Sequence, residues 1–164
     1  MNQGFVDKHD EQNERPLSNE FIRGLITGEG CFSFHTGWRR KNGRKSKMPT
    51  FYIGMHERDE NLLRMVRDSL GLRNSIYNHK AWRNDGCQRG RMSALVVRDF
   101  EQLKDIIIPF FYKKLKGYKA IQFMEWLEKI GSDPDVSDRY KSLYRLYKWG
   151  IFDKNPKFSK KFKD

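Results

Sequence analysis

The sequence predicts an α+β fold in the order αββαββα, followed by further helices. Two observations support this order. Segments with apolar residues at helical spacing alternate with pairs of segments in which apolar and polar residues alternate, and Asn-Gly or Asn-Asp-Gly divides each pair. A chain of 164 residues is one domain by length. We divide it into a flexible N-terminal arm (1–17), one folded domain (18–149) and a basic C-terminal tail (150–164).

The first predicted helix contains the apolar segment 21–30. N-cap and first-turn residue types come just before it, namely Ser18, Asn19 and Glu20. Gly24 costs about 1 kcal/mol relative to alanine inside a helix, so a small residue there indicates the close approach of another helix. The segment ends in Gly28-Glu29-Gly30. A carboxylate at a helix C-terminus sits where the helix dipole is negative, so Glu29 calls for a cation.

The first predicted strand pair comprises residues 31–38 and 49–55. Between them, residues 39–47 hold six basic side chains around Asn42-Gly43, which predicts a positively charged hairpin tip. A helix follows at about Asp59–Leu70, with an apolar stripe and Gly71 as its stop.

The second strand pair, 74–83 and 89–97, repeats this arrangement and leads into a helix that begins at Asp99. We expect Pro109 to interrupt that helix. Two more helices are predicted, at 117–130 and 137–148, and the basic tail 153–164 is expected to fray. In the first of these helices the residues expected to face the core are Ile121, Met124 and Leu127.

The composition points to a polyanionic partner. The formal charge is +12, from 33 Lys and Arg against 21 Asp and Glu, and the basic residues cluster between aromatic strands. The two cysteines, Cys31 and Cys87, have no zinc-site spacing. No segment is long and apolar enough to span a membrane and residues 1–15 do not form a signal peptide, so we expect an intracellular protein without a membrane partner, in an organelle or a bacterial cytoplasm.

The segment 24–30, followed by the strand-like 31–34, resembles the signature of the LAGLIDADG homing endonucleases. The resemblance implies that the motif helices of two halves pack through small residues and that the motif acid, here Glu29, binds the catalytic metal. The motif occurs once, which implies a homodimer. The interface residues implied are Phe21, Gly24, Leu25 and Gly28. Two departures are Thr27, where the family usually has an acid, and Arg23, where a small residue is usual.

The resemblance also implies a curved antiparallel sheet that lies on double-stranded DNA, with helices covering its other face. Cleavage would use Mg²⁺ held by Glu29 and the Gly28 carbonyl, with Mn²⁺ as a substitute and Ca²⁺ supporting binding without cleavage. Lys116 is assigned as the catalytic lysine, in preference to Lys114 or Lys119, because a helix starts beside it.

Met55 stands where the family has a glutamine that orders water, and a thioether cannot donate a hydrogen bond. Either the water network differs, or His56 or Arg58 substitutes.

Side chains on the outer strand faces are expected to read DNA bases, and the hairpin cations to contact phosphates. The predicted DNA-binding residues are Ser33, His35, Arg39, Arg40, Lys41, Arg44, Lys45, Lys47, Tyr52, Asn78, Lys80, Arg89, Arg91 and Ser93.

The leading hypothesis is therefore a homodimeric, metal-dependent homing endonuclease that makes a double-strand break in a long, partly palindromic site. A catalytically reduced DNA-binding regulator or intron maturase of the same fold is the alternative that Met55 favours. A non-specific RNA-binding domain fits the charge but gives no reason for Gly-Glu-Gly.

Overall fold

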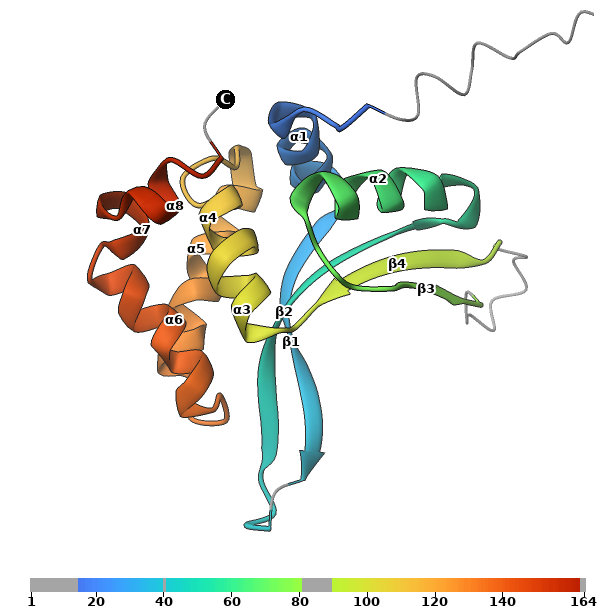
Figure 1. Cartoon of the computed structure of the whole chain (residues 1–164). Coiled ribbons are helices and arrows are strands. Elements are labelled where there is room, and N and C mark those ends of the chain that lie inside the picture. The colour runs from blue at the N-terminus through green and yellow to red at the C-terminus, as the bar shows by residue number, and fades with distance from the viewer. Residues whose placement is uncertain (1–14, 40, 81–89, 163–164) are drawn as a thin grey trace, which may run out of the picture.

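The computed structural model describes residues 15–39, 41–80 and 90–162. The elements begin with α1 (Asn19–Glu29), β1 (Gly30–Arg39), β2 (Lys45–His56) and α2 (Glu60–Leu70). They continue with β3 (Ile76–His79), β4 (Met92–Val97) and the short α3 (Phe100–Gln102). The predicted αββαββα order and the α+β class are confirmed (Figure 1).

The four strands form one open antiparallel sheet in the order β1-β2-β4-β3. The sheet is strongly curved, and the long β1–β2 hairpin extends beyond the rest of it (Figure 1). The described helices lie on the convex side, and none of them covers the concave side. The concave side is therefore open to a large partner.

The core lies between the sheet and the helices. Phe51 and Ile53 of β2 and Leu95 of β4 are fully buried, because alternate strand residues face the helices. Ile22 and Ile26 of α1 meet them from above with no exposed surface. Helix α2 ends at Gly71, whose φ of 69° is the left-handed conformation expected of a helix stop.

Pro109 does not end the third helix, contrary to the prediction. The chain stays helical from α3 through a π-helical turn (Leu103–Ile107) and into α4 (Ile108–Phe111). Proline lacks an N–H and clashes with the carbonyl four residues earlier, and a π turn changes the hydrogen-bond spacing just before it. Pro109 then occupies the first turn of α4, where a missing N–H costs little.

The C-terminal part is more ordered than predicted. After α5 (Gly117–Ser132) and α6 (Asp138–Lys148), the chain forms α7 (Ile151–Lys154) and α8 (Pro156–Ser159). Phe152 and Phe158 are buried at 3% and 7% exposure, so the fraying expected from residue 153 onward is wrong for residues 153–162. These buried aromatic side chains attach the segment to the core, which its largely basic composition did not predict.

Helix α5 also corrects one core prediction. Leu127 is buried and Met124 half-buried, but Ile121 is 53% exposed. The helix buries Phe123 and Trp126 instead, and the Trp126 indole donates to the Ser33 carbonyl at 2.9 Å.

The arm 1–14, the Asn84-Asp85-Gly86 turn and residues 163–164 lie outside the described residues. Within the described ranges, no helix combines the length and apolar character needed to cross a membrane.

Candidate active site and nucleic-acid interface

Glu29 is the last residue of α1, and its side chain is exposed. Helix and strand join without a linker, because Gly30 adopts an extended conformation while its N–H still donates to the Ile26 carbonyl. A Cβ at position 30 would lie 2.4 Å from Ile26 Cγ2, which requires glycine there. Among the described residues, no cation or hydrogen-bond donor pairs with the Glu29 carboxylate. The carboxylate is therefore available to a ligand.

Lys119 is the lysine that the structure places in contact with the end of the motif. Its Nζ donates to the Gly30 carbonyl at 2.6 Å, and the side chain is half-buried at the start of α5. Sequence reasoning considered Lys119 but preferred Lys116. The sequence did not show which lysine would point toward the motif. Lys119 lies in the first turn of α5, whereas Lys116 is the N-cap residue of that helix.

Lys116 is exposed and lines a different part of the motif helix. A cleft of about 580 Å³ lies beside α1, with Lys113 and Lys114 on the same wall as Lys116. The α1 residues that line it are Glu20, Arg23, Gly24 and Thr27. The catalytic role of Lys116 thus stays a prediction, and Lys119 becomes a second candidate.

The predicted interface residues form one exposed stripe on α1. Phe21 is 48% exposed, Gly24 and Gly28 are exposed, and Leu25 is half-buried. A Cβ added at Gly24 or Gly28 would meet no side chain or neighbouring element of the described chain within 4 Å. Fold packing within the described chain therefore gives no reason for glycine at either position, and an outside partner would give one.

The two departures from the family pattern are accommodated within the subunit. Arg23 is 7% exposed, and its Nε donates to the Phe110 carbonyl at 3.2 Å while its guanidinium lies over the Phe110 ring. The Thr27 hydroxyl donates to the Arg23 carbonyl at 2.8 Å. Neither side chain belongs to the exposed stripe.

The first two strands present three predicted DNA-binding residues on the concave side. Phe32 pairs with Phe51 across β1 and β2 and faces the core, so the alternate residues Ser33 and His35 face outward. Tyr52 faces outward from β2 for the same reason. Their position agrees with the predicted role, which itself remains a prediction.

The second strand pair has the opposite phase from the one predicted. Ser93 is fully buried, with its Oγ 2.5 Å from Asn78 Oδ1 and 3.4 Å from Glu60 Oε2 of α2. Ser93 and Asn78 therefore face the helices, which corrects their assignment to the outer face. A hydrogen bond from Arg64 and a second from Asn78 lower the pKa of Glu60 in this cluster.

Tyr77 and His79 take the outward positions on β3 instead. They pair with Ala94 and Met92 of β4, and Tyr77 is 58% exposed. Both phases of Ser75-Ile76-Tyr77-Asn78-His79 contain polar and apolar residues, so the sequence pattern did not distinguish them. Burial of Ile76 against the core sets the phase.

The hairpin cations divide into two groups. Arg39, Lys41, Arg44 and Lys45 are exposed, as expected for phosphate contacts, and of these Arg44 also lies 3.9 Å from Asp135 Oδ1 through its Nε. Lys47 instead forms an ion pair with Asp133, with 2.7 Å between Nζ and Oδ2, which contradicts a free phosphate-binding role for it. Lys80 and Arg91 are exposed and stay predictions, whereas Arg40 and Arg89 lie outside the described residues.

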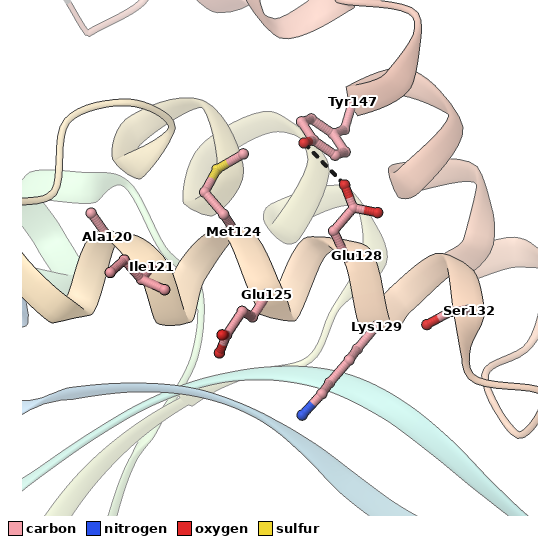
Figure 2. Close-up of a pocket in the computed structure, with 8 residues that line it drawn as sticks. All are labelled: Ala120, Ile121, Met124, Glu125, Glu128, Lys129, Ser132 and Tyr147. Carbon is pink, nitrogen blue, oxygen red and sulfur yellow. Dashed lines mark hydrogen bonds between the residues drawn. The ribbon is translucent and has the colours of Figure 1, made fainter.

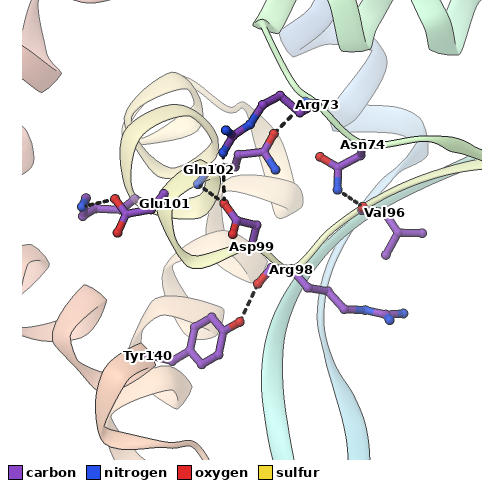
Figure 3. Close-up of polar contacts among 9 residues, drawn as sticks. Arg73, Asn74, Val96, Arg98, Asp99, Glu101, Gln102 and Tyr140 are labelled. Carbon is purple, nitrogen blue, oxygen red and sulfur yellow. Dashed lines mark hydrogen bonds and ion pairs between the residues drawn. The ribbon is translucent and has the colours of Figure 1, made fainter.

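Arg98 is a cation of the concave side that the sequence analysis missed. It follows Val96, which pairs with Tyr52, by two residues, and its side chain extends toward the strands and away from Tyr140 (Figure 3). The backbone around it is held on both sides, because Asn74 donates to the Val96 carbonyl at 2.8 Å and Tyr140 to the Arg98 carbonyl at 2.6 Å. Its buried Nε has no hydrogen-bond partner among the described residues. The alternation of inward and outward residues along β4, continued one residue past Val97, would have predicted that Arg98 faces outward.

The structure gives Met55 no polar function. Its side chain packs against the core in the same row as Ser93. Of the two possible substitutes, His56 accepts a hydrogen bond from the Arg58 amide through Nδ1 at 3.2 Å and so begins the turn Glu57–Asp59. Arg58 is exposed, with its Nε 3.7 Å from Asp59 Oδ2.

A further cleft, of about 710 Å³, lies along α5 and is bordered by Tyr147 of α6 (Figure 2). The exposed Ile121 lines it, together with the carboxylates of Glu125 and Glu128. Tyr147 donates to Glu128 at 3.2 Å. This cleft contains neither Glu29 nor Lys119, and its two acids would repel a phosphate backbone.

The geometry so far defines a class of protein: a curved sheet with an open concave side, attached to a helix that ends in an exposed acid. Solved structures share this arrangement. I-LtrWI, a LAGLIDADG homing endonuclease bound to target DNA, matches with 26% identity and a TM-score of 0.53 over 68% of this chain and 36% of that chain. The homing endonuclease I-TnaI matches with 21% identity and a TM-score of 0.51 over 82% and 99%.

I-SmaMI, bound to an uncleaved DNA target in the presence of calcium ions, matches with 20% identity and a TM-score of 0.53 over 80% and 43%. At identities of 20% and 21%, the similarity to I-SmaMI and I-TnaI shows a shared fold and nothing further. Residues 22–130 match the LAGLIDADG endonuclease family, and the chain belongs to that family. It spans 36% to 43% of the lengths of I-LtrWI and I-SmaMI and 99% of I-TnaI. A comparison with curated protein sequences gave no match.

Proposed function

We propose that this protein is a site-specific DNA endonuclease that makes a metal-dependent double-strand break in a long, partly palindromic site as a homodimer. The observation that carries the proposal is the exposed carboxylate of Glu29, which has no partner among the described residues; it directly follows Gly28 of the glycine stripe and precedes Gly30, whose carbonyl accepts a hydrogen bond from Lys119. Membership of the family supports the reaction class. The DNA-bound state of I-LtrWI supports duplex DNA as the partner.

The residues of one subunit are better suited to a metal ion shared between two subunits than to a metal ion bound by one subunit alone. The described residues contain no group of three or more His, Cys, Asp or Glu side chains that could hold a metal ion. Mg²⁺ is bound through one or two carboxylates together with phosphate oxygens, so Glu29 and the Gly28 carbonyl of two copies would suit it on DNA. Bound Mg²⁺ would activate the attacking water and stabilise the leaving oxygen. Mn²⁺ would substitute, and Ca²⁺ would support binding only.

The other residues would bind and orient the duplex. The sheet is a curved ribbon whose concave side presents Ser33, His35 and Tyr52, and side chains on such a ribbon can reach base edges in the major groove. The exposed hairpin cations and Arg98 would contact phosphates. Lys119 would place a positive charge near the scissile phosphate, where negative charge grows during cleavage.

The decisive experiment selects bound sites from a random duplex pool in Ca²⁺ and then incubates the selected site with the protein in Mg²⁺. We expect cleavage of both strands. Tight, selective binding without cleavage in Mg²⁺ or Mn²⁺ would instead support the DNA-binding regulator or intron maturase. Met55 favours that second function, because it offers no donor where the family has glutamine.

The dimer proposal predicts the effect of Gly24→Leu. A Cβ at position 24 would meet no side chain or neighbouring element of the described chain within 4 Å, but leucine there would obstruct the helix of a second copy. We expect a monomer by sedimentation that does not bind the full site. The isolated subunit should gain roughly 0.5–1 kcal/mol in free energy of unfolding, because glycine is a poor helix residue.

Asn61→Leu is the matched control for this variant. Asn61 is exposed on α2, outside the glycine stripe, so leucine there should leave the dimer and its binding intact. A dimeric Gly24→Leu protein that still cleaves would exclude the stripe as the interface.

A further inference from the structure

The β1–β2 hairpin extends past the other strands, yet it is held near its tip, at Lys47 (Figure 1). Residues of the loop between α5 and α6, which comprises 133–137, contact it there. Two of the loop's five residues are acidic, whereas the hairpin tip is strongly basic. The contact between them is therefore electrostatic as well as structural.

Backbone contacts set the position of the hairpin against this loop. The Lys47 amide donates to the Asp135 carbonyl at 3.0 Å, and Lys47 forms a parallel bridge with Val136. Val136 is 2% exposed, so the loop is anchored in the core. The hairpin is thus connected to the helical side of the molecule at one strand position.

Side-chain contacts reinforce the same connection. Asp133 accepts from Lys47 Nζ at 2.7 Å and, through its other oxygen, from the Asp135 amide at 2.9 Å. The Asp135 carboxylate lies 3.9 Å from Arg44 Nε. The hydrogen bond between Lys47 and Asp133 raises the pKa of the lysine and lowers that of the acid. Both stay charged at neutral pH.

A single partly exposed ion pair adds little to stability, so we sought another explanation for this one. Two acids beside a DNA-binding hairpin reduce its attraction for any duplex, because non-specific affinity depends on the number of cations free to contact phosphates. A hairpin held at one angle, in contrast, keeps its side chains in register with one groove geometry. The first effect weakens the non-specific part of binding, and the second favours the correct site over random DNA.

We infer that Asp133 and Asp135 are positioning residues that hold the β1–β2 hairpin and occupy Lys47, and so raise the preference for the target site over random DNA. This inference rests on the proposed function. The acids would not touch the DNA themselves.

The test is Asp133→Asn combined with Asp135→Asn, compared with wild type for the selected site and a random duplex of equal length, both in Ca²⁺. Random-duplex affinity should rise several-fold while target affinity stays level or falls, so the ratio of the two drops about tenfold. Release of Lys47 should steepen the salt dependence on random DNA by about 0.9 in log-log slope for each new phosphate contact. Glu128→Gln is the control, because Glu128 pairs with Lys148 on α5 and α6 and its loss changes charge without touching the hairpin.

Hydrogen exchange in the free protein supplies a readout that needs no DNA. Amides of residues 45–50 should exchange faster in the double variant and not in Glu128→Gln. An equal rise of affinity for both duplexes would mean that the two acids only repel DNA, and an equal fall would indicate general damage to the protein. Either result overturns the inference, as do unchanged exchange rates at residues 45–50. A wild type that binds neither duplex would overturn the proposed function, while the exchange measurement still decides whether the loop holds the hairpin.

Discussion

Replacing Glu29 with glutamine should abolish cleavage of the selected site in Mg²⁺ and leave affinity in Ca²⁺ unchanged or higher. Glutamine keeps the shape but loses the charge that would bind the metal. In the proposed complex the exposed carboxylate would lie close to the DNA backbone and repel phosphate, so its loss should not weaken binding. It also removes an anion from the negative end of α1, which should stabilise the fold by roughly 0.3–1 kcal/mol.

The measurement is single-turnover cleavage in Mg²⁺, with binding in Ca²⁺ and sedimentation as checks on the folded dimer. Glu125→Gln is a suitable control, since Glu125 is an exposed acid of α5 outside the motif. If Glu29→Gln cuts at the wild-type rate, the metal ligand has been assigned to the wrong residue.

Lys119→Met should lower the cleavage rate about a hundredfold, or about 3 kcal/mol of transition-state stabilisation, with only a modest loss of binding. The reason is its contact with Gly30, which holds the ammonium at the end of the motif. Lys116→Met, measured in parallel, tests the assignment made from sequence. Because Lys116 is an exposed N-cap residue beside the α1 cleft, we expect a smaller effect on rate.

The Lys119→Arg variant distinguishes a catalytic role of Lys119 from a role in supporting the helix–strand junction. A residue that only supports the helix junction would lose cleavage and Ca²⁺ binding together when replaced by methionine, and arginine would restore both. A residue that stabilises growing charge would lose rate alone. A hundredfold loss in Lys116→Met with near-normal Lys119→Met would reinstate Lys116 as the catalytic lysine.

The sequence predicted the elements that depend on local patterns. Apolar spacing located α1 and α2, and the glycine at 71 marked a helix end that the structure confirms. The alternation of Phe32 and Phe34 likewise placed Ser33 and His35 on the outer side of β1. In each of these cases the residues that decide the outcome are neighbours in the chain.

Features that depend on distant residues were missed. The partner of Lys47 is Asp133, 86 residues away, and no local pattern indicates that pairing. The phase of β3 depends on which of its residues the core accepts, and the two phases looked alike in sequence. Lys119 was recognisable as a candidate, but only the packing of α5 against α1 shows which lysine meets the motif.

The direct junction between α1 and β1 couples movements of the motif helix to the first strand. Glu29 ends the helix and Gly30 begins the strand, with no residue between them to bend. β1 is ten residues long, which corresponds to about 33 Å at ~3.3 Å per residue. A rotation of about 5° at the helix would then move the far end of the strand by about 3 Å, close to the length of a hydrogen bond. Substitutions in the glycine stripe would therefore change which base pairs are tolerated far from the cleavage site, without altering any side chain near them.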